Sequence, residues 1–355
     1  MLNKVYPTNN VFIIAELSAN HGHSLDTTLA TVKAAKECGA DAIKIQTYTA
    51  DTITLDSDKE WFCIKQGTIW DGTTLHRLYK EAFTPWEWHH AIQEEANRQG
   101  LVFFSTPFDR TAADFLESLS VPIYKIASFE LNDIPLVEYV ASKRKPMILS
   151  TGISTLGEIE EAVQACRNAG NNDITLLKCT SQYPARPEDM NLLTMPHLGK
   201  TFNVPTGLSD HTMGDAVTLA AVALGAKVIE KHFILDRSIG GPDSSFSMEP
   251  VEFRNMVNSI RTVENALGKI SYELTEKMRT SRAFSRSLFV CEDVKKGDLF
   301  SDKNIRSIRP GNGLHPRHLN AVIGRCATCS IERGTPLAMG HVGWDITSQQ
   351  GTIDE

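Results

Sequence analysis

The feature that most constrains the fold of this chain is a repeated alternation of short apolar runs and helical segments. Each run is rich in branched or aromatic apolar residues and closes on turn residues, which is typical of buried strands. Eight runs occur, at residues 11–20, 41–49, 101–108, 122–130, 145–152, 174–181, 204–210 and 227–233. Segments with apolar residues at helical spacing separate most of them, including 25–40, 111–120, 155–170 and 215–226. Such alternation implies parallel strands with right-handed crossovers, and eight units predict a closed α/β barrel of the (β/α)8, or TIM-barrel, type.

An open, doubly wound α/β sheet is the alternative architecture for this alternation. Sheets of that kind usually carry a glycine-rich phosphate loop after the first strand. Here the first run ends in ELSANHG, which contains a single glycine. The barrel is therefore the preferred prediction, and we assign residues 1–270 to it.

Residues 50–85 depart from the repeat. They form a long, aromatic-rich insertion before the helical segment 86–100. Long loops in compact domains are more often functional than accidental. We expect Trp61, Trp70 and Tyr79 either to cover a bound ligand or to pack a small core within the insertion.

The pattern changes again after the helical segment 251–269. Residues 271–285 read as a polar linker, and residues 286–355 have short strand-like runs, glycine turns and little helical pattern. About 60 residues of this kind are enough for a marginal independent domain. We therefore predict a barrel, a linker and a small second domain with a short tail.

Charge and hydropathy exclude two classes of partner. The formal net charge is −7, so no general positive field exists to attract nucleic acid. No apolar run is long enough to span a membrane, and the N-terminal MLNKVYPTNN lacks the apolar core of a signal peptide. Of the seven cysteines, only Cys326-Ala-Thr-Cys329 forms a close pair, which is weak support for zinc, so reduced structural thiols are preferred. We expect a cytoplasmic protein.

Polar side chains end or follow every one of the eight runs. In a barrel the carboxyl ends of the strands meet at one mouth, where catalytic groups lie. A single strand-end histidine is more often structural, but a full ring of polar ends predicts an active site. The groups are Glu16, Asn20 and His21; Lys44 and Gln46; Thr106; Lys125, Ser128 and Glu130; Ser150 and Thr151; Lys178, Thr180, Ser181 and Tyr183; Ser209, Asp210 and His211; and Glu230 and His232.

The mixture of side chains narrows the chemistry. Lys44 and Lys125, together with hydroxyls, suit a phosphate or carboxylate ligand, and either lysine can instead form a Schiff base, as in aldolases built on this barrel. His211 and His232, on adjacent strands, can present imidazoles to one divalent ion with positions left for water or substrate. Glutamates at three strand ends supply acid and base candidates. Lys231 lies on the alternate face of its strand and is expected to point away from the interior.

Several motifs together resemble the sialic acid synthase family. They are GLSDHT (207–212), EKHF (230–233), GGPD (240–243), the NH of ELSANHG, and RPGNGL (309–314). The resemblance covers nearly the whole chain and implies a TIM barrel followed by a small C-terminal antifreeze-like (SAF) domain. It also implies a condensation of phosphoenolpyruvate with an amino sugar to a nine-carbon 2-keto acid, a divalent metal cation (Mn2+, Mg2+ or Co2+) as cofactor, and a domain-swapped homodimer.

Within that family, three stretches are most similar to the pseudaminic acid synthases. They are IAELSANH, KIQTYT with the following DTITLDSDKE, and IKQGTIWDG…LYKEAFTPWEWH. This similarity implies 2,4-diacetamido-2,4,6-trideoxy-L-altrose as the acceptor, with pseudaminic acid and phosphate formed by C–O cleavage. Ser181, in TSQYP, stands where sialic acid synthases usually have asparagine, which fits a differently decorated sugar.

Matched position by position, the family pattern implies a role for each candidate residue. His211 and His232 become the metal ligands. The glutamates become the acid–base candidates: Glu16, Glu130 and Glu230. The residues implied to bind phosphoenolpyruvate are Lys44, Lys125, Thr151, Ser181 and Ser209. Those implied to face the sugar are Gln46, Tyr183 and Arg309, the last reaching the N-acyl group from the C-terminal domain of a partner subunit.

Three rival hypotheses remain open. A sialic acid or legionaminic acid synthase would use the same mechanism with another acceptor sugar. A Schiff-base aldolase would form a covalent adduct on Lys44 or Lys125. A structural or carbohydrate-binding scaffold, with a C-terminal unit that resembles an ice-binding protein, would not require the polar mouth. The synthase with the altrose-type acceptor is the preferred hypothesis.

Overall fold

The first part of the molecule is a closed barrel of eight parallel strands. The computed structural model describes residues 10–344. The strands pair in sequence order and β8 returns to β1. The predicted (β/α)8 barrel is therefore confirmed. The strands are β1 (Phe12–Glu16), β2 (Ala42–Thr47), β3 (Val102–Pro107), β4 (Tyr124–Ile126), β5 (Met147–Ser150), β6 (Ile174–Cys179), β7 (Thr206–Asp210) and β8 (Val228–His232).

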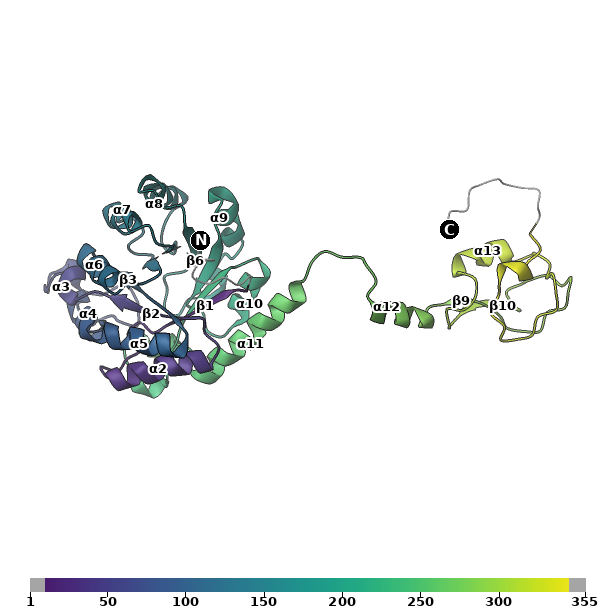
Figure 1. The fold of residues 1–355 in the computed structure, drawn as a ribbon, viewed down its shortest axis with the longest axis horizontal. Helices are drawn as coiled ribbons and strands as arrows, with labels where there is room; N and C mark the ends of the chain where they lie inside the picture. Colours follow the sequence, from purple (N-terminus) through teal and green to yellow (C-terminus); the bar gives the residue numbers. More distant parts are fainter. Residues whose placement is uncertain (1–9, 345–355) are drawn as a thin grey trace. The chain divides into compact units, whose positions relative to one another are not determined.

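Helices connect the strands and cover the outside of the barrel (Figure 1). Several of them begin at a side-chain cap; for example, Thr155 and Glu158 form a capping box at the start of α8. The sequence pattern does not single out α9, which contains the poor helix formers Pro196 and Gly199. The helices are α2 (Leu25–Glu37), α3 (Ala50–Ile53), α4 (Leu75–Ala82), α5 (His89–Gln99), α6 (Arg110–Ser118), α7 (Ile134–Ser142), α8 (Leu156–Asn168), α9 (Thr194–Phe202), α10 (Ala216–Ala223) and α11 (Pro250–Leu267).

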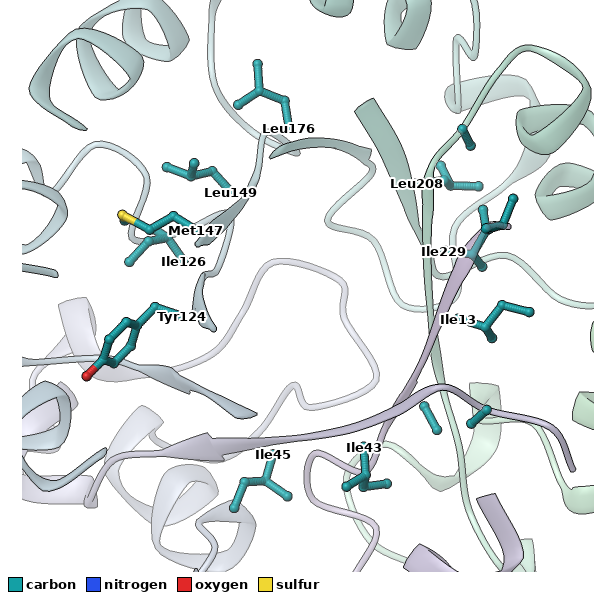
Figure 2. Close-up of a cluster of buried hydrophobic side chains, with 14 of the residues drawn as sticks. Ile13, Ile43, Ile45, Tyr124, Ile126, Met147, Leu149, Leu176, Leu208 and Ile229 are labelled. Carbon is teal, nitrogen blue, oxygen red and sulfur yellow. The ribbon is translucent and has the colours of Figure 1, made fainter. Parts of the chain in front are cut away.

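The barrel core consists of two apolar layers on opposite faces of the sheet. Outward-facing strand residues pack against the helices, and Figure 2 shows them pointing away from the barrel interior; they include Ile13, Ile43, Ile45, Tyr124, Ile126, Leu149, Leu208 and Ile229. Inside, a second cluster fills the amino end of the barrel and is called the apolar floor here; it consists of Phe12, Ile14, Ala42, Phe104, Ile123, Ile148, Leu177 and Val228. Because side chains alternate along a strand, the next inward positions lie directly above this floor, and these are the polar ones.

One glycine is required where β7 approaches β8. A Cβ at Gly207 would lie 2.2 Å from the carbonyl oxygen of Val228. Any larger residue would push the two strands apart. The GLSDHT motif therefore has a packing reason at its glycine in addition to its polar end.

The second compact unit begins at Lys269. The predicted linker 271–285 contains a short helix, α12 (Glu276–Ser281), and β9 (Ser287–Val290) then pairs antiparallel with β10 (Ile305–Ile308) before the short α13 (Leu319–Val322). A separate core supports this unit; its members include Leu288, Val290, Val294, Phe300, Ile305, Val322 and Leu337. Within residues 10–344, no helix combines the length and the apolar character needed to cross a bilayer.

Candidate active site

The polar ends of the strands meet above the apolar floor in a buried charged layer. Lys44 Nζ lies 2.7 Å from Glu16 Oε2 and 3.7 Å from Glu230 Oε1. Lys44 also donates to Thr106 Oγ1 at 3.3 Å, and Ser209 Oγ donates to Glu230 Oε1 at 3.1 Å. Strand register explains these meetings, because Glu16 is paired with Lys44 across β1 and β2, and Ser209 with Glu230 across β7 and β8.

Burial and charge set the protonation of this layer. Burial raises the pKa of Glu16 to about 7, although the Lys44 ammonium opposes the shift. Burial lowers the pKa of Lys44, but the carboxylates of Glu16 and Glu230 outweigh it, so that pKa is raised. Burial also raises the pKa of Glu230, but Lys125 and Lys44 outweigh it, so that pKa is lowered. Near neutral pH the layer therefore holds a charged Lys44, an ionised Glu230, and a Glu16 able to take or release a proton.

Beside this layer lie a lysine, a glycine and two serines, which we call the hydroxyl cradle: Lys125, Gly152, Ser128 and Ser181. Lys125 Nζ donates to Ser150 Oγ at 2.7 Å, and the hydroxyls of Ser128 and Ser181 lie 2.5 Å apart. Gly152 permits this approach, because a Cβ there would lie 2.3 Å from Ser181 Oγ and 2.8 Å from Ser128 Oγ. A cation with convergent hydroxyls suits a phosphate or carboxylate group. The neighbouring Thr151 lies at the same strand end, where its hydroxyl donates to the backbone.

The two histidines predicted as metal ligands lie next to each other, with ring centroids 5.3 Å apart. His211 Nδ1 is 2.9 Å from the carbonyl oxygen of Thr180, a contact of the kind that orients metal-binding histidines. Burial lowers the pKa of His211, but a hydrogen bond to the Cys179 side chain outweighs it, so that pKa is raised. Nδ1 of His232 is buried and makes no hydrogen bond with any described residue. Burial lowers the pKa of His232 well below its usual value, which favours the neutral, metal-binding form.

The two histidines can bind a divalent cation only if other molecules supply the remaining ligands. Residues 10–344 contain no group of three or more His, Cys, Asp or Glu side chains able to hold a metal ion. The two imidazoles would then be the protein's contribution, and oxygen atoms of substrate and water would complete the coordination shell.

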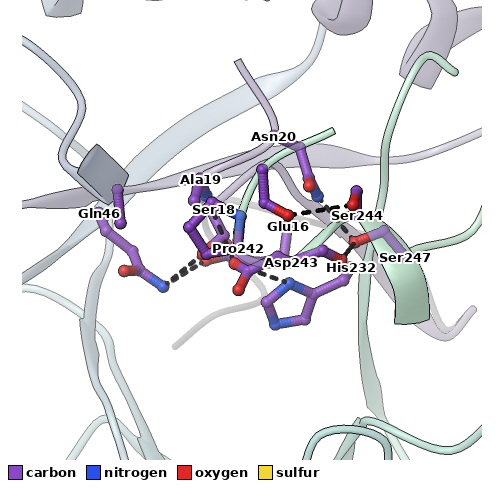
Figure 3. Close-up of polar contacts among 12 residues, drawn as sticks. Glu16, Ser18, Ala19, Asn20, Gln46, His232, Pro242, Asp243, Ser244 and Ser247 are labelled. Carbon is purple, nitrogen blue, oxygen red and sulfur yellow. Dashed lines mark hydrogen bonds and ion pairs between the residues drawn. The ribbon is translucent and has the colours of Figure 1, made fainter. Parts of the chain in front are cut away.

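A hydrogen-bonded network joins the loop after β1 to the segment after β8 (Figure 3). Asn20 Nδ2 donates to Ser247 Oγ at 2.8 Å and to the carbonyl of Phe233 at 3.1 Å, and Ser247 Oγ donates to the carbonyl of Asp243 at 2.7 Å. Figure 3 shows the carboxyl group of Asp243 facing His232, with Oδ2 3.6 Å from Nδ1. The NH and GGPD motifs, far apart in sequence, therefore meet beside a candidate metal ligand.

A cavity of about 550 Å³ opens outward from this layer, and the insertion 50–85 forms much of its wall. Gln46 lies at its base and donates from Nε2 to Ser18 Oγ at 2.9 Å and to Glu16 Oε1 at 3.1 Å. The polar lining is mostly at this base and includes Ser18, Gln46, Glu130, His232 and Asp243. The apolar lining comes largely from the insertion and includes Ile53, Ile64, Leu75, Leu78 and Tyr79.

The aromatic residues of the insertion have different positions. Trp70 lines the cavity, and its Nε1 donates to the carbonyl of Pro242 at 3.0 Å, which ties the insertion to the segment after β8. The ring of Trp70 lies 5.4 Å from that of Tyr183, which in turn lies 4.3 Å from the His211 ring. Tyr79 also lines the cavity, whereas Trp61 is 84% exposed. Trp61 therefore packs no core within the insertion, and it is not part of the cavity wall.

Glu130 lies beyond the end of β4 and lines the cavity. Burial raises the pKa of its carboxyl group to about 7. Its Oε2 atom is buried and has no hydrogen-bond partner among the described residues. A carboxyl group in this position can meet a ligand as either a proton donor or a proton acceptor.

The structure brings the predicted metal, acid–base, phosphoenolpyruvate and sugar residues to the mouth of the barrel except Arg309. Two other strand-end groups do not face the mouth: Asp210 points outward and pairs with Lys231, and Lys178 lies on the face of β6 opposite the interior Leu177. Arg309 lies just after β10 in the second unit, where its side chain is exposed. Sequence reasoning does not single out Gly152 or Asp243. The GGPD motif, which ends in Asp243, is the signal that points to the latter; Gly152 carries no such signal, because its importance depends on what its missing Cβ would touch.

Comparison with known proteins adds a family match for each unit. A model described as the NeuB family matches residues 31–272, and a model of the SAF domain matches residues 285–342. The second match agrees with the predicted antifreeze-like domain.

Similar proteins cover nearly the whole chain. A pseudaminic acid synthase from Campylobacter jejuni is 49% identical over 330 residues, which cover 93% of this chain and 96% of that protein. A pseudaminic acid synthase from Helicobacter pylori is 46% identical over 331 residues, 93% and 97% of the two chains. An N,N'-diacetyllegionaminic acid synthase from Legionella pneumophila is 38% identical over 336 residues, 93% and 94% of the two chains.

Among solved structures, an N-acetylneuraminic acid (sialic acid) synthetase from Leptospira borgpetersenii, in complex with citrate, has a similar fold. The TM-score is 0.69 and the sequence identity is 33%, over 77% of this chain and 90% of that one.

Proposed function

This chain belongs to the NeuB family, and from that premise we propose that it condenses phosphoenolpyruvate with 2,4-diacetamido-2,4,6-trideoxy-L-altrose and water. The products are pseudaminic acid and phosphate, released by C–O cleavage. Relatives named for this activity are 46% to 49% identical, whereas the legionaminic acid synthase is 38% identical. The altrose-type acceptor is therefore preferred over its sister sugars.

One structural observation carries the proposal: a sugar-sized cavity adjoins the buried charged layer through Gln46, which lines the cavity and donates a hydrogen bond to Glu16. The hydroxyl cradle and Lys44 supply the positive charge and the donors that a phosphate with a carboxylate requires. The cavity above them is polar at its base and apolar along the insertion. A 6-deoxy sugar with two acetamido groups has methyl groups to place against such an apolar wall.

The residues support a stepwise mechanism. Lys44 and Lys125 hold phosphoenolpyruvate with its C3 carbon toward the cavity, where the open-chain aldehyde of the sugar lies. Attack by C3 leaves positive charge at C2, which the ionised Glu230 carboxylate stabilises. Glu130 would give a proton to the new alkoxide and Glu16 would take one from the attacking water; a pKa of about 7 for each supports these roles. In the tetrahedral intermediate the bond between C2 and the phosphate oxygen then breaks, the C2 hydroxyl becomes the keto group, and its proton leaves with the phosphate.

A divalent cation, Mn2+, Mg2+ or Co2+, belongs to this proposal. His211 and His232 would hold it, since their rings lie side by side at the mouth and His232 Nδ1 makes no hydrogen bond with a described residue. When bound, it would act as a Lewis acid on the aldehyde oxygen.

The test is phosphate release from phosphoenolpyruvate and Mn2+ with three acceptors supplied separately. They are the altrose-type sugar, N-acetylmannosamine and the legionaminic acid precursor. We expect release with the altrose-type sugar, and about 10- to 100-fold lower kcat/KM with N-acetylmannosamine, because an apolar wall rejects an added hydroxyl only moderately. Release with another sugar alone would overturn the acceptor, and silence with all three would overturn the activity.

The alternative Schiff-base mechanism requires a neutral lysine side chain, whereas phosphate binding requires a charged one. A nucleophilic amine must be neutral, and the paired Lys44 has a raised pKa, whereas burial lowers the pKa of Lys125. Lys125 is thus the residue to examine. Borohydride treatment with both substrates should leave Lys125 unmodified by mass spectrometry, and chelation should abolish activity; an adduct with activity surviving chelation would favour the aldolase.

Two further parts of the proposal concern the protein's setting. We place the reaction in the cytoplasm, which agrees with the free thiols of all seven cysteines. We also propose a domain-swapped homodimer in which Arg309 of one subunit reaches the sugar bound by the other.

A further inference from the structure

The last barrel strand places three ionisable residues in a row, and one of them faces away from the mouth. Glu230 and His232 point inward, so Lys231 points outward, as the sequence predicts. Lys231 is nevertheless only 1% exposed, because α10 and the turn before it cover it. Its Nζ lies 2.8 Å from Asp210 Oδ2, and Asp210 is its cross-strand partner in the register of β7 and β8.

Every hydrogen-bonding position of this ion pair is used. Besides Asp210, Lys231 Nζ donates to the carbonyl oxygens of Thr212, at 2.6 Å, and Gly214, at 3.0 Å. Asp210 Oδ1 accepts from the backbone and hydroxyl of Thr212, at 2.9 and 2.8 Å. Asp210 Oδ2 also accepts from Thr218 Oγ1 of α10 at 2.8 Å. The pair therefore ties β8 to the turn 211–214 and to the following helix.

Stability is a weak reason for such a pair. A buried ion pair loses about as much in desolvation as it gains in attraction, and a well-packed apolar pair is often neutral or stabilising in its place. An apolar pair would, however, lack the directional hydrogen bonds that hold the two strands and the turn in one relative position. Each charged residue immediately flanks one of the two histidines: Asp210 precedes His211, and Lys231 precedes His232.

We propose that the Asp210–Lys231 pair is a positioning device that fixes the separation and orientation of His211 and His232. The turn that carries His211 cannot shift relative to β8 without breaking several buried hydrogen bonds at once. Because the two histidines are the proposed ligands of the divalent cation, the inference rests on that part of the proposed function. The pair itself touches neither metal nor substrate.

The first experiment measures the affinity of the full-length protein for Mn2+ alone, from the free-ion signal in electron paramagnetic resonance. Lys231→Met should raise the Kd for Mn2+ by about 10- to 100-fold, the usual effect of losing an orienting partner of a metal ligand. That variant leaves a buried carboxylate unpaired, which threatens folding. The double variant Asp210→Asn/Lys231→Met removes both charges and should show the same loss of affinity in a folded protein.

A matched control distinguishes an effect on the positions of the two histidines from a general loss of folding stability. Arg261 ties α11 to the amino end of the barrel, where Nη2 is 3.0 Å from Asp41 Oδ2. Arg261→Met should lower the melting temperature and leave the Kd for Mn2+ unchanged, because no candidate ligand lies nearby. If the control weakens Mn2+ binding as much as the double variant does, loss of stability alone explains the effect and the proposal is wrong.

A second readout does not depend on metal. In the metal-free protein His211 and His232 are buried, so diethyl pyrocarbonate should modify them slowly. In the double variant their modification, followed by peptide mass spectrometry, should be faster by about fivefold or more as the turn opens locally. The exposed His90 serves as an internal standard.

The two readouts also separate the possible failures. A wild-type protein that binds no divalent ion, combined with faster labelling in the double variant, would remove the metal from the proposed function and keep the positioning role. A folded double variant with wild-type labelling rates and wild-type Mn2+ affinity would overturn the positioning role itself.

Discussion

Glu130 shows most simply how burial prepares a side chain for chemistry. Its Oε2 atom lies in the cavity wall with no partner among the described residues, so the ionised form lacks the stabilisation that water would give. The pKa of about 7 is the result, and it places the protonation change where an enzyme acting near neutral pH needs it. The same burial has a measurable cost to stability.

Replacing Glu130 by glutamine should reveal that cost through its pH dependence. The pKa of Glu130 is raised from 4.5 to about 7 in the folded protein, so ionisation disfavours folding and the penalty grows as pH rises between those values. Relative to wild type, Glu130→Gln should gain about 2 kcal/mol more at pH 8 than at pH 5. Urea unfolding at both pH values measures this. A difference between the two proteins that is the same at pH 5 and pH 8 would show that Glu130 titrates normally.

At the scale of the elements, the hydroxyl cradle depends on three strand ends. Ser128 follows β4, Gly152 follows β5 and Ser181 follows β6. The two serines meet only because nothing occupies the space beside Gly152. The site is therefore as sensitive to an added methyl group as to a lost hydroxyl.

Gly152→Ala should lower kcat/KM for phosphoenolpyruvate by about 100-fold, since displacing positioning groups by up to an ångström costs about that much. The reason is the overlap of the new Cβ with both serine hydroxyls. Gly157→Ala, at the start of the adjacent helix α8, is the matched control because its Cβ would meet nothing within 4 Å. Steady-state kinetics on both variants test this prediction. If Gly152→Ala and Gly157→Ala have the same kcat/KM, the cradle does not hold the substrate.

The insertion provides the second prediction at this scale. Trp70→Ala removes part of the cavity wall and its tie to Pro242, so KM for the sugar should rise about tenfold, which corresponds to about 1.4 kcal/mol of lost binding free energy. KM for phosphoenolpyruvate should change little, because Trp70 is not part of the cradle. Trp61→Ala is the control, since Trp61 is 84% exposed. A rise in both KM values, or an equal effect of the control, would argue against a role in sugar binding.

The sequence predicts the mouth of the barrel because the relevant rule is simple: the carboxyl ends of parallel strands meet. Glu16, Lys44 and His211 follow from it without any knowledge of side-chain contacts. The rule says nothing about which groups touch. Whether Lys231 finds Asp210 depends on the register of two strands, and whether Trp70 or Trp61 faces the cavity depends on the path of an irregular loop. Those outcomes are set by packing, which periodicity does not encode.

At the scale of the whole molecule, the site and Arg309 belong to different compact units. The RPGNGL motif places Arg309 directly after β10, and its exposed side chain is free to meet another surface. If that surface is the mouth of a second subunit, each active site takes residues from two chains. Such a requirement is testable with proteins that are each inactive alone.

Mixing the inactive variants His211→Ala and Arg309→Ala should restore activity if the arginine acts across subunits. By symmetry, each heterodimer would contain one site with both residues intact, so it should show about half the wild-type activity. Tandem affinity tags isolate the heterodimer for the assay. Activity absent from verified heterodimers, with the single variants folded, would mean that Arg309 does not complete a neighbouring site.

The apolar floor restricts the order in which molecules can bind in the barrel and leave it. Phe12, Phe104 and the other floor residues fill the amino end of the barrel, so molecules enter and leave by the mouth alone. The cradle and Lys44 lie next to the floor, and the cavity for the sugar lies between them and the solvent. If phosphoenolpyruvate occupies the depth as proposed, it would bind before the sugar, and phosphate would leave after the sugar acid.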